Sequence, residues 1–150
     1  MAKKTLSSQL FLKHFHHPDK YGEWLGYKVL KFDRKKLRAE GSLSIRKDHL
    51  SPAGRVHGGV ISGFFDFACG VAAFTTMDDN DFCSTVELKV NYFRPIELGD
   101  ELIVQTQVVF RGRKICVIHG FIYKNGEKRP TAMATATFNI VPGKSFTTNN

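Results

Sequence analysis

The sequence has few cysteines, and they lack the spacing of a structural framework. Among its 150 residues there are three, Cys69, Cys83 and Cys116, which form no CxxC pair. This argues against a zinc ribbon and against a disulfide-stabilised secreted domain. Three histidines cluster near the start, but no matching cysteine or carboxylate pattern follows His14, His16 and His17. We therefore predict no metal ion and no other cofactor.

Long runs of one charge are also missing, although the chain is basic. Its 22 Lys and Arg residues against 14 Asp and Glu residues give a net charge of +8. Such a surplus suits partners that carry phosphate groups. The basic residues are dispersed, however, and no basic strand pair with interleaved aromatics and no recognition helix accompanies them. The net charge makes a nucleic-acid binder one hypothesis. The dispersed charges argue against it, so we predict no nucleic-acid partner.

Signals for export and for membrane insertion are absent as well. The first residues, MAKKTLSSQLF, are basic but lack the apolar region of a signal peptide. Only residues 56–74 are long and apolar enough to resemble a membrane span, and their aspartate and glycines fit a soluble core better. We predict a cytoplasmic protein without membrane insertion, built as a single domain over residues 1–150.

Residues 56–74, VHGGVISGFFDFACGVAAF, are the most distinctive stretch of the chain. They are apolar on every side and contain no proline, and their length exceeds that of an ordinary strand, so they predict one buried helix over about residues 57–75. Glycine costs about 1 kcal/mol per helical position relative to alanine. Close approach of another backbone or of a ligand would explain the four that occur here, Gly58, Gly59, Gly63 and Gly70.

Two features of this helix indicate a functional site. Asp66 lies in its apolar middle, and a buried carboxylate requires either a partner or a function. His57 and the glycines after it place free backbone N–H groups at the helix start, where anions bind and carbonyl oxygens are polarised. His57 and Asp66 are roughly 13 Å apart along the helix axis. A centre that uses both therefore needs two copies of the helix, across a homodimer.

Alternating segments before and after this helix predict an antiparallel sheet, and the class is α+β. The expected strands cover residues 24–32, 37–45, 85–93, 101–111, 115–123 and 131–141. In the strand over residues 85–93, the alternation places Val86 and Leu88 on one face and Thr85 on the other. Apolar spacing near the start predicts a short helix over about residues 5–16, and a loose tail is expected from about residue 142.

The pattern HGGVISGFFD, followed by TVELKVNYFRP and a late ATATF, resembles the hotdog-fold acyl-CoA thioesterases of the PaaI type. The resemblance covers most of residues 56–141 in the expected order. It implies an antiparallel sheet wrapped around the long central helix. It also implies a homodimer whose two subunits pair edge to edge and share two symmetric sites. A dimer of dimers is a further possibility.

The resemblance also implies roles for individual residues. The Gly58 amide is the candidate oxyanion donor, and Asp66 of the partner subunit is the candidate base or nucleophile. His57 is either a second donor or a cap of the helix. Thr85 either helps to hold the attacking water or is an ordinary strand threonine. Many relatives carry an asparagine or glutamine where this chain has Ser51, whose hydroxyl lacks the fixed donor and acceptor pair of an amide.

The expected substrate is an acyl-CoA with a medium-chain, long-chain or aryl acyl group. Residues proposed to bind its coenzyme A part are Gly59, Arg94, Arg111, Arg113 and Lys114. The acyl group would lie along the central helix, near one or more of its phenylalanines. The alternative function is a hotdog module that binds acyl-CoA without hydrolysing it, and Ser51 slightly favours that alternative.

Overall fold

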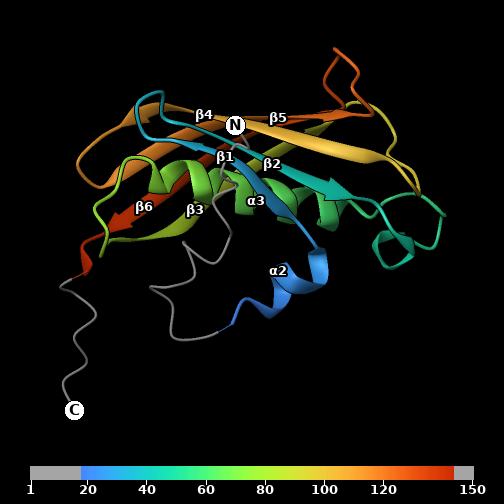
Figure 1. The fold of residues 1–150 in the computed structure, drawn as a ribbon, viewed down its shortest axis with the longest axis horizontal. Coiled ribbons are helices and arrows are strands. Elements are labelled where there is room, and N and C mark those ends of the chain that lie inside the picture. The colour runs from blue at the N-terminus through green and yellow to red at the C-terminus, as the bar shows by residue number, and fades with distance from the viewer. Residues whose placement is uncertain (1–17, 144–150) are drawn as a thin grey trace, which may run out of the picture.

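The fold is a six-stranded antiparallel sheet packed on one long helix (Figure 1). The structure is a computed structural model, and it describes residues 18–143. The predicted α+β class and the antiparallel sheet around a central helix are confirmed. The helix predicted over residues 5–16, and the predicted tail from residue 144 on, lie outside the described residues.

The sheet has the strand order β1-β2-β4-β5-β6-β3, and all neighbouring strands are antiparallel. The strands are β1 (Lys28–Asp33), β2 (Arg38–Ser44), β3 (Phe82–Tyr92), β4 (Glu101–Arg111), β5 (Ile115–Lys124) and β6 (Ala132–Val141). The helices are α2 (Lys20–Leu25) and α3 (Gly58–Phe74), with a short 3-10 helix, η1, over Lys47–His49. No helix in the described part of the chain is long and apolar enough to span a membrane.

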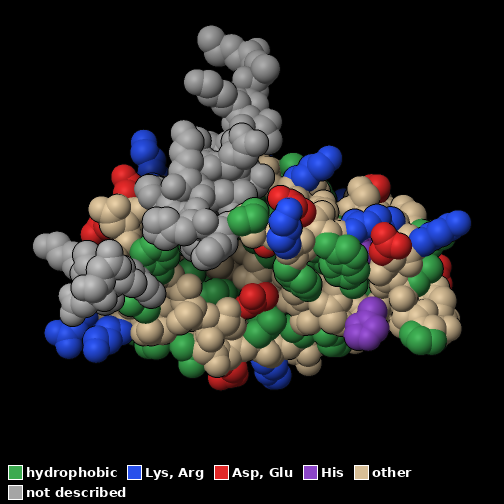
Figure 2. All heavy atoms as spheres, turned by 90° about the horizontal axis from the view of Figure 1, so that it is seen from below, with side chains coloured by type: hydrophobic (Ala, Val, Ile, Leu, Met, Phe, Trp, Pro, Cys, Tyr) green, Lys and Arg blue, Asp and Glu red, His purple; other side chains and the backbone are tan. Residues whose placement is uncertain are grey.

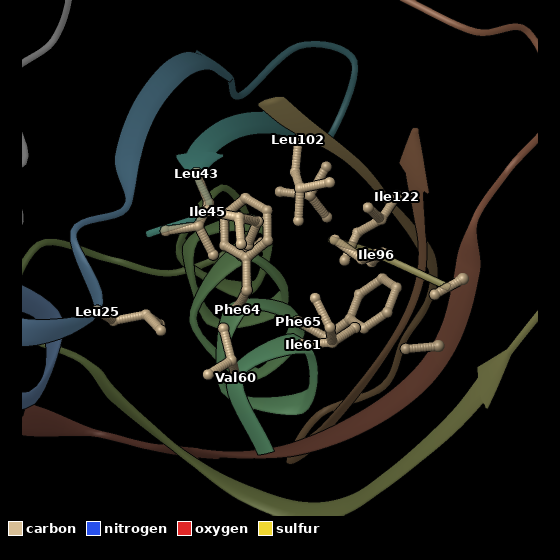
Figure 3. Packing of buried hydrophobic residues seen from close by; sticks show 14 residues of the cluster. Leu25, Leu43, Ile45, Val60, Ile61, Phe64, Phe65, Ile96, Leu102 and Ile122 are labelled. Carbon is tan, nitrogen blue, oxygen red and sulfur yellow. The ribbon is translucent and has the colours of Figure 1, made fainter. Parts of the chain in front are cut away.

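The core lies between α3 and the inner face of the sheet. Phe64 and Phe65 are fully buried, and they point from α3 toward Leu43, Leu102 and Ile122 of the strands (Figure 3). Burial of a phenylalanine side chain contributes about 1.5–3 kcal/mol. Alternate residues of β6, among them three alanines, are buried as the sequence pattern predicts. Their small side chains let the bulky face of α3 approach the sheet closely.

One face of α3 is not buried, which corrects the expectation of a helix enclosed on all sides. This stripe consists of Gly59, Ser62, Gly63, Asp66 and Gly70, none of which is buried. The sheet covers only part of the helix surface, so Gly59 is exposed and the other four residues are partly exposed. We call these five residues the open stripe of α3. Asp66 is therefore a partly exposed carboxylate in a shallow, glycine-rich surface.

The first predicted strand began too early, because residues 20–25 form α2. The Asp19 side chain accepts a hydrogen bond from the Gly22 N–H at 2.8 Å and caps the helix start. Gly26 ends the helix with a left-handed φ of 82°. An aspartate cap and a left-handed glycine are the usual boundaries of a short helix. Trp24 accordingly belongs to α2 and not to a strand.

Candidate active site

The start of α3 is capped by His57 and leaves one amide free. The His57 Nδ1 accepts a hydrogen bond from the Gly59 N–H at 2.9 Å, so this ring nitrogen caps the helix, which is one of the two roles predicted for His57. The Val60 N–H donates to the His57 carbonyl oxygen at 2.9 Å. Among the described residues, the Gly58 N–H has no hydrogen-bond partner. It is therefore available to a ligand at the positive end of the helix dipole.

The capping bond also determines which nitrogen of the exposed His57 ring carries the proton. A neutral imidazole whose Nδ1 accepts a hydrogen bond carries its proton on Nε2. The side chain is exposed, so this Nε2–H can serve as a second donor beside the Gly58 amide. The Gly59 amide is already engaged in the cap, which removes its N–H from the groups expected to bind coenzyme A.

A hollow of about 300 Å³ opens at the same end of α3. It is lined by Arg55, Val56, Gly58, Ile61, Tyr92, Phe93, Arg94, Pro95 and Ile96. The Tyr92 hydroxyl donates to the Gly58 carbonyl oxygen at 3.0 Å, which ties the end of β3 to the first turn of α3. The hollow thus combines an apolar lining with a free backbone donor, as sites for small organic groups commonly do.

Asp66 is held by Thr85, and a bulge in β3 makes this contact possible. The Thr85 hydroxyl donates to Asp66 Oδ1 at 2.7 Å. The pairing of β3 with β6 shifts register between Thr85 and Glu87, which leaves Val86 unpaired and 61% exposed. The predicted strict alternation, which put Thr85 on the face opposite Leu88, is therefore wrong. The extra residue turns Thr85 to the helix side, where Leu88 also packs on the core.

The two parts of the site lie apart within one chain. Gly58 and Asp66 are eight residues apart on α3, which corresponds to about 12 Å along the helix axis. Each part is complete in itself, with a free donor at the helix start and an oriented carboxylate in the middle of the helix. An acyl transfer reaction requires both an electrophilic stabiliser and a base or nucleophile.

Comparison with known proteins identifies the family. Residues 53–131, more than half of the chain, match the model of the Thioesterase superfamily. The chain belongs to this superfamily. The predicted resemblance to PaaI-like hotdog thioesterases is confirmed by similarity to solved structures of that type.

Relatives of this thioesterase-superfamily chain span nearly its whole length. A protein from Saccharolobus solfataricus named "Putative esterase" is 27% identical over 130 residues, which cover 87% of this chain and 89% of that protein. An asparagine-to-aspartate mutant of the phenylacetic acid degradation protein PaaI from Thermus thermophilus has a TM-score of 0.72 at 26% identity, over 81% of this chain and 98% of that one. A phenylacetic acid degradation-related protein from Ralstonia eutropha JMP134 has a TM-score of 0.76 at 25% identity, over 87% and 97%.

Ser51, which the thioesterase resemblance places among the catalytic candidates, lies in a tight loop before α3. The Ser51 N–H donates to the Arg55 carbonyl oxygen at 2.7 Å, and its own carbonyl oxygen accepts from the Gly54 N–H at 2.9 Å. Ser51 is not among the residues that line the hollow, and its hydroxyl has no hydrogen-bond partner in residues 18–143. Within one chain, Ser51 therefore lies outside the lining of the hollow at the helix start.

The predicted cationic residues divide into two groups at opposite ends of α3. Arg94 lines the hollow, but one terminal nitrogen of its guanidinium pairs with Glu127 and the other donates to the carbonyl oxygen of Arg129, while its Nε is buried without a partner in residues 18–143. Arg111 donates to Thr76 Oγ1 at 3.1 Å, just beyond the other end of α3. Arg113 and Lys114 follow it in the turn between β4 and β5. A helix of 17 residues is about 25 Å long, which separates the two groups.

Sequence reasoning missed Arg55 and Tyr92. Arg55 is exposed, lines the hollow and has no ion pair or side-chain hydrogen bond in the described part of the chain. Its position two residues before His57 was the available signal. Tyr92 was not singled out in the predicted strand, yet it is 54% exposed and its hydroxyl donates to the Gly58 carbonyl oxygen.

The cysteines near Asp66 are neutral thiols. Burial, together with the Asp66 carboxylate, holds the pKa of Cys69 far above its usual range. Burial, together with Cys116 and Asp66, raises the pKa of Cys83 to about 12. The thiolate is the reactive form of cysteine, and the thiolates of Cys69 and Cys83 are scarcely populated at neutral pH. Asp66 is therefore the better candidate for the reacting group. Over residues 18–143, no cluster of His, Cys, Asp and Glu side chains is arranged to hold a metal ion.

These pKa shifts predict slow alkylation of the folded protein. At pH 8 we expect iodoacetamide to modify Cys69 and Cys83 about 100-fold more slowly in the native state than in urea, because the raised pKa values and burial suppress the thiolate. Mass spectrometry of time points would measure both rates. Rapid native labelling of Cys83 would contradict the neutral-thiol assignment.

Proposed function

We propose that this protein hydrolyses acyl-CoA thioesters to a free acid and coenzyme A, in sites that two subunits share. The observation that carries the proposal is the unpartnered Gly58 N–H at the start of α3, which borders an apolar-lined hollow in a thioesterase-superfamily chain; that N–H has no partner among the described residues. A thioester carbonyl oxygen is the natural acceptor for such a donor. The acyl group is medium-chain, long-chain or aryl.

The Gly58 N–H acts as the oxyanion donor. It hydrogen-bonds the thioester carbonyl oxygen, and the bond strengthens as negative charge develops on that oxygen in the tetrahedral transition state. The α3 dipole adds positive potential at the same point. The His57 Nε2–H is the second donor to the same oxygen. Because the capping bond and the Tyr92 contact fix this turn in advance, no reorganisation is needed during the reaction.

Asp66 of the partner subunit acts on the other side of the carbonyl. Thr85 occupies Oδ1, and Oδ2 has no hydrogen-bond partner within residues 18–143, so Oδ2 is available to act. As a base, Oδ2 removes a proton from water, the resulting hydroxide adds to the carbonyl carbon, and the C–S bond breaks as the sulfur takes up the proton that Oδ2 had removed, so coenzyme A leaves as the thiol. As a nucleophile, Oδ2 adds to the carbonyl carbon itself and the C–S bond breaks, which gives an anhydride and a coenzyme A thiolate that takes a proton from water; a second water then hydrolyses the anhydride. Both routes yield the same acid and thiol.

The exposed edge of β3 is the proposed dimer contact. β3 is an edge strand of 11 residues, and Val86 and Tyr92 on it are both more than half exposed. The opposite edge, β1, is shorter at 6 residues. Long unpaired edges favour pairing with another chain. Antiparallel pairing of two β3 copies around a two-fold axis runs their α3 helices in opposite directions, so each helix start approaches the middle of the other helix. A dimer of dimers is the larger assembly proposed.

The phosphates of coenzyme A are proposed to bind at the rim of the hollow. Arg55 is the leading group, since it is exposed beside Gly58 and unpaired within residues 18–143. Arg111, Arg113 and Lys114 lie at the far end of α3, so they reach the same substrate only from the partner subunit, whose helix runs the opposite way. All three cysteines are free thiols, which supports the proposed cytoplasmic location.

Release of free thiol from a panel of acyl-CoAs tests the function. The panel covers acetyl, hexanoyl, dodecanoyl, benzoyl and phenylacetyl thioesters, with purified wild-type protein. We expect turnover of at least one of them. Binding of these thioesters without thiol release would instead support the alternative of an acyl-CoA-binding module, for which the Ser51 substitution is the specific observation.

A further inference from the structure

Tyr21 of α2 lies directly on the open stripe of α3. A Cβ atom added at Gly63 would collide with the Tyr21 hydroxyl, so only a glycine at this position lets the phenol reach the helix. Gly63 precedes Asp66 by three residues, which places them about 4.5 Å apart along the axis and about 60° apart around it. Tyr21 therefore stands within one helical turn of the carboxylate.

Tyr21 belongs to a group of aromatic rings that are fixed but not buried. Its ring centroid is 6.0 Å from that of Trp24, and the two side chains are 54% and 44% exposed. Trp24 is held by an edge contact with the buried His49 and by the Arg46 guanidinium, 5.7 Å from its ring centroid. Aromatic rings held in place while half exposed leave apolar surface available to a ligand.

A second aromatic pair lies next to Asp66. Phe67 stacks on Tyr27 with an interplanar angle of 17°, and the Tyr27 hydroxyl is hydrogen-bonded to Asp19 at the start of α2. Phe64 and Phe65 are fully buried in the core, whereas Phe67 is partly exposed. Figure 2 shows the molecule from the side of α2 and α3. Where grey atoms do not cover that face, hydrophobic side chains and uncharged groups make up most of it, with an acidic side chain near its centre.

We propose that Tyr21 is a specificity-determining residue that, with Trp24, forms one wall of the acyl site and selects flat aryl groups over long straight chains. The proposal rests on the proposed function, because it takes Asp66 as the reacting carboxylate. Ser62 and Asp66 of the open stripe are only partly buried, so a flat ring can lie beside the helix there, and the aromatic rings of α2 offer it stacking partners. A long chain extending past Asp66 along the open stripe meets the Tyr21 phenol, which blocks its way.

Three variants and two substrates test the wall. We compare kcat/KM for phenylacetyl-CoA and dodecanoyl-CoA in the wild type, Tyr21→Ala, Tyr21→Phe and Phe110→Ala. Phe110 is a matched control, an aromatic residue that is 57% exposed on β4. We expect Tyr21→Ala to shift the ratio of the two kcat/KM values toward dodecanoyl-CoA by about tenfold or more, whereas Tyr21→Phe keeps the ratio within about threefold. Phe110→Ala should leave it unchanged. An unchanged ratio in Tyr21→Ala would overturn the proposal.

Binding separates a failure of this proposal from a failure of the proposed function. Dissociation constants of the non-hydrolysable thioether analogues of both substrates are measured on the same proteins. A wild type that releases no thiol would refute hydrolysis, but the ratio of the two dissociation constants would still decide the role of Tyr21. A ratio that Tyr21→Ala leaves unchanged would refute that role whether or not the protein is an enzyme.

Gly63→Ala probes the same wall from the helix side. The new methyl group must displace the Tyr21 hydroxyl, which is the far end of an exposed side chain. Alanine is also the better helix former, so the melting temperature should not fall. We expect the aryl preference to drop while the protein remains as stable as the wild type. A fully retained aryl preference in this variant would contradict the placement of Tyr21 beside the substrate.

Discussion

Gly58→Pro is expected to lower kcat by about 100- to 1,000-fold, because it removes the backbone N–H that donates to the proposed oxyanion. The same substitution should leave the fold intact. Gly58 is the first residue of α3, where proline is favoured and where the N–H that it lacks had no partner within residues 18–143. The preceding residue, His57, has φ −67° and ψ 134°, an extended conformation that a following proline accepts.

Gly58→Ala is the matched control for this experiment. A Cβ atom at Gly58 would lie 3.5 Å from the Tyr92 hydroxyl, an ordinary van der Waals distance. Alanine therefore adds the same Cβ atom and keeps the N–H, and its kcat should stay within about fivefold of the wild type. Thermal denaturation and binding of a thioether analogue check the fold and the site of each variant. Equal losses in both variants would show that space at Gly58, and not its N–H, is what matters.

Asp66→Ala and Asp66→Asn are each expected to lower kcat by about 100-fold or more, since neither side chain can act as a base or nucleophile. Their stability should change little. In the described residues, the hydrogen bond from Thr85 is the only one that the Asp66 side chain makes, and it is exposed, so its loss costs about 1 kcal/mol. Steady-state thiol release and thermal denaturation measure the two effects.

Thr85→Val separates orientation of the carboxylate from its chemistry. Valine keeps the shape of threonine but cannot donate a hydrogen bond to Asp66. We therefore expect kcat to fall by about tenfold, less than in the Asp66 variants.

Single turnover in ¹⁸O-labelled water distinguishes the two routes proposed for Asp66. Label in the Asp66 carboxylate after the first turnover indicates a nucleophile, whereas label in the acid product alone indicates that water attacked the acyl carbon, as it does when Asp66 is a base. Full activity in both Asp66 variants would remove this residue from the mechanism.

The sequence predicted those elements whose signals are regular and extend over many residues. α3 was located to within a residue at each end because its apolar run was too long for a strand. The buried alternation of β2 and β6 likewise follows directly from the sequence pattern. The catalytic candidates at both ends of the HGG-to-aspartate pattern depended on the family resemblance as well as on the chemistry of helix starts.

What the sequence did not show depends on contacts between distant segments or on single-residue irregularities. The bulge at Val86 has no distinct local signature, yet it decides that Thr85 meets Asp66. The pairing of Arg94 with Glu127 joins residues 33 positions apart and withdraws a cation that was expected to bind phosphate. The six-residue α2 was hidden because Trp24 fits the start of a strand equally well, although the cap at Asp19 was visible.

The central claim, that each site takes Gly58 from one subunit and Asp66 from the other, is tested most directly by mixing two inactive variants. Gly58→Pro and Asp66→Asn proteins are produced separately and together, in equal amounts. Random pairing gives about one site in four with an intact Gly58 and an intact Asp66, so the mixture should recover about a quarter of wild-type activity. A mixture that stays as inactive as its two parents, despite proven exchange of subunits, would show that the site is not shared between subunits.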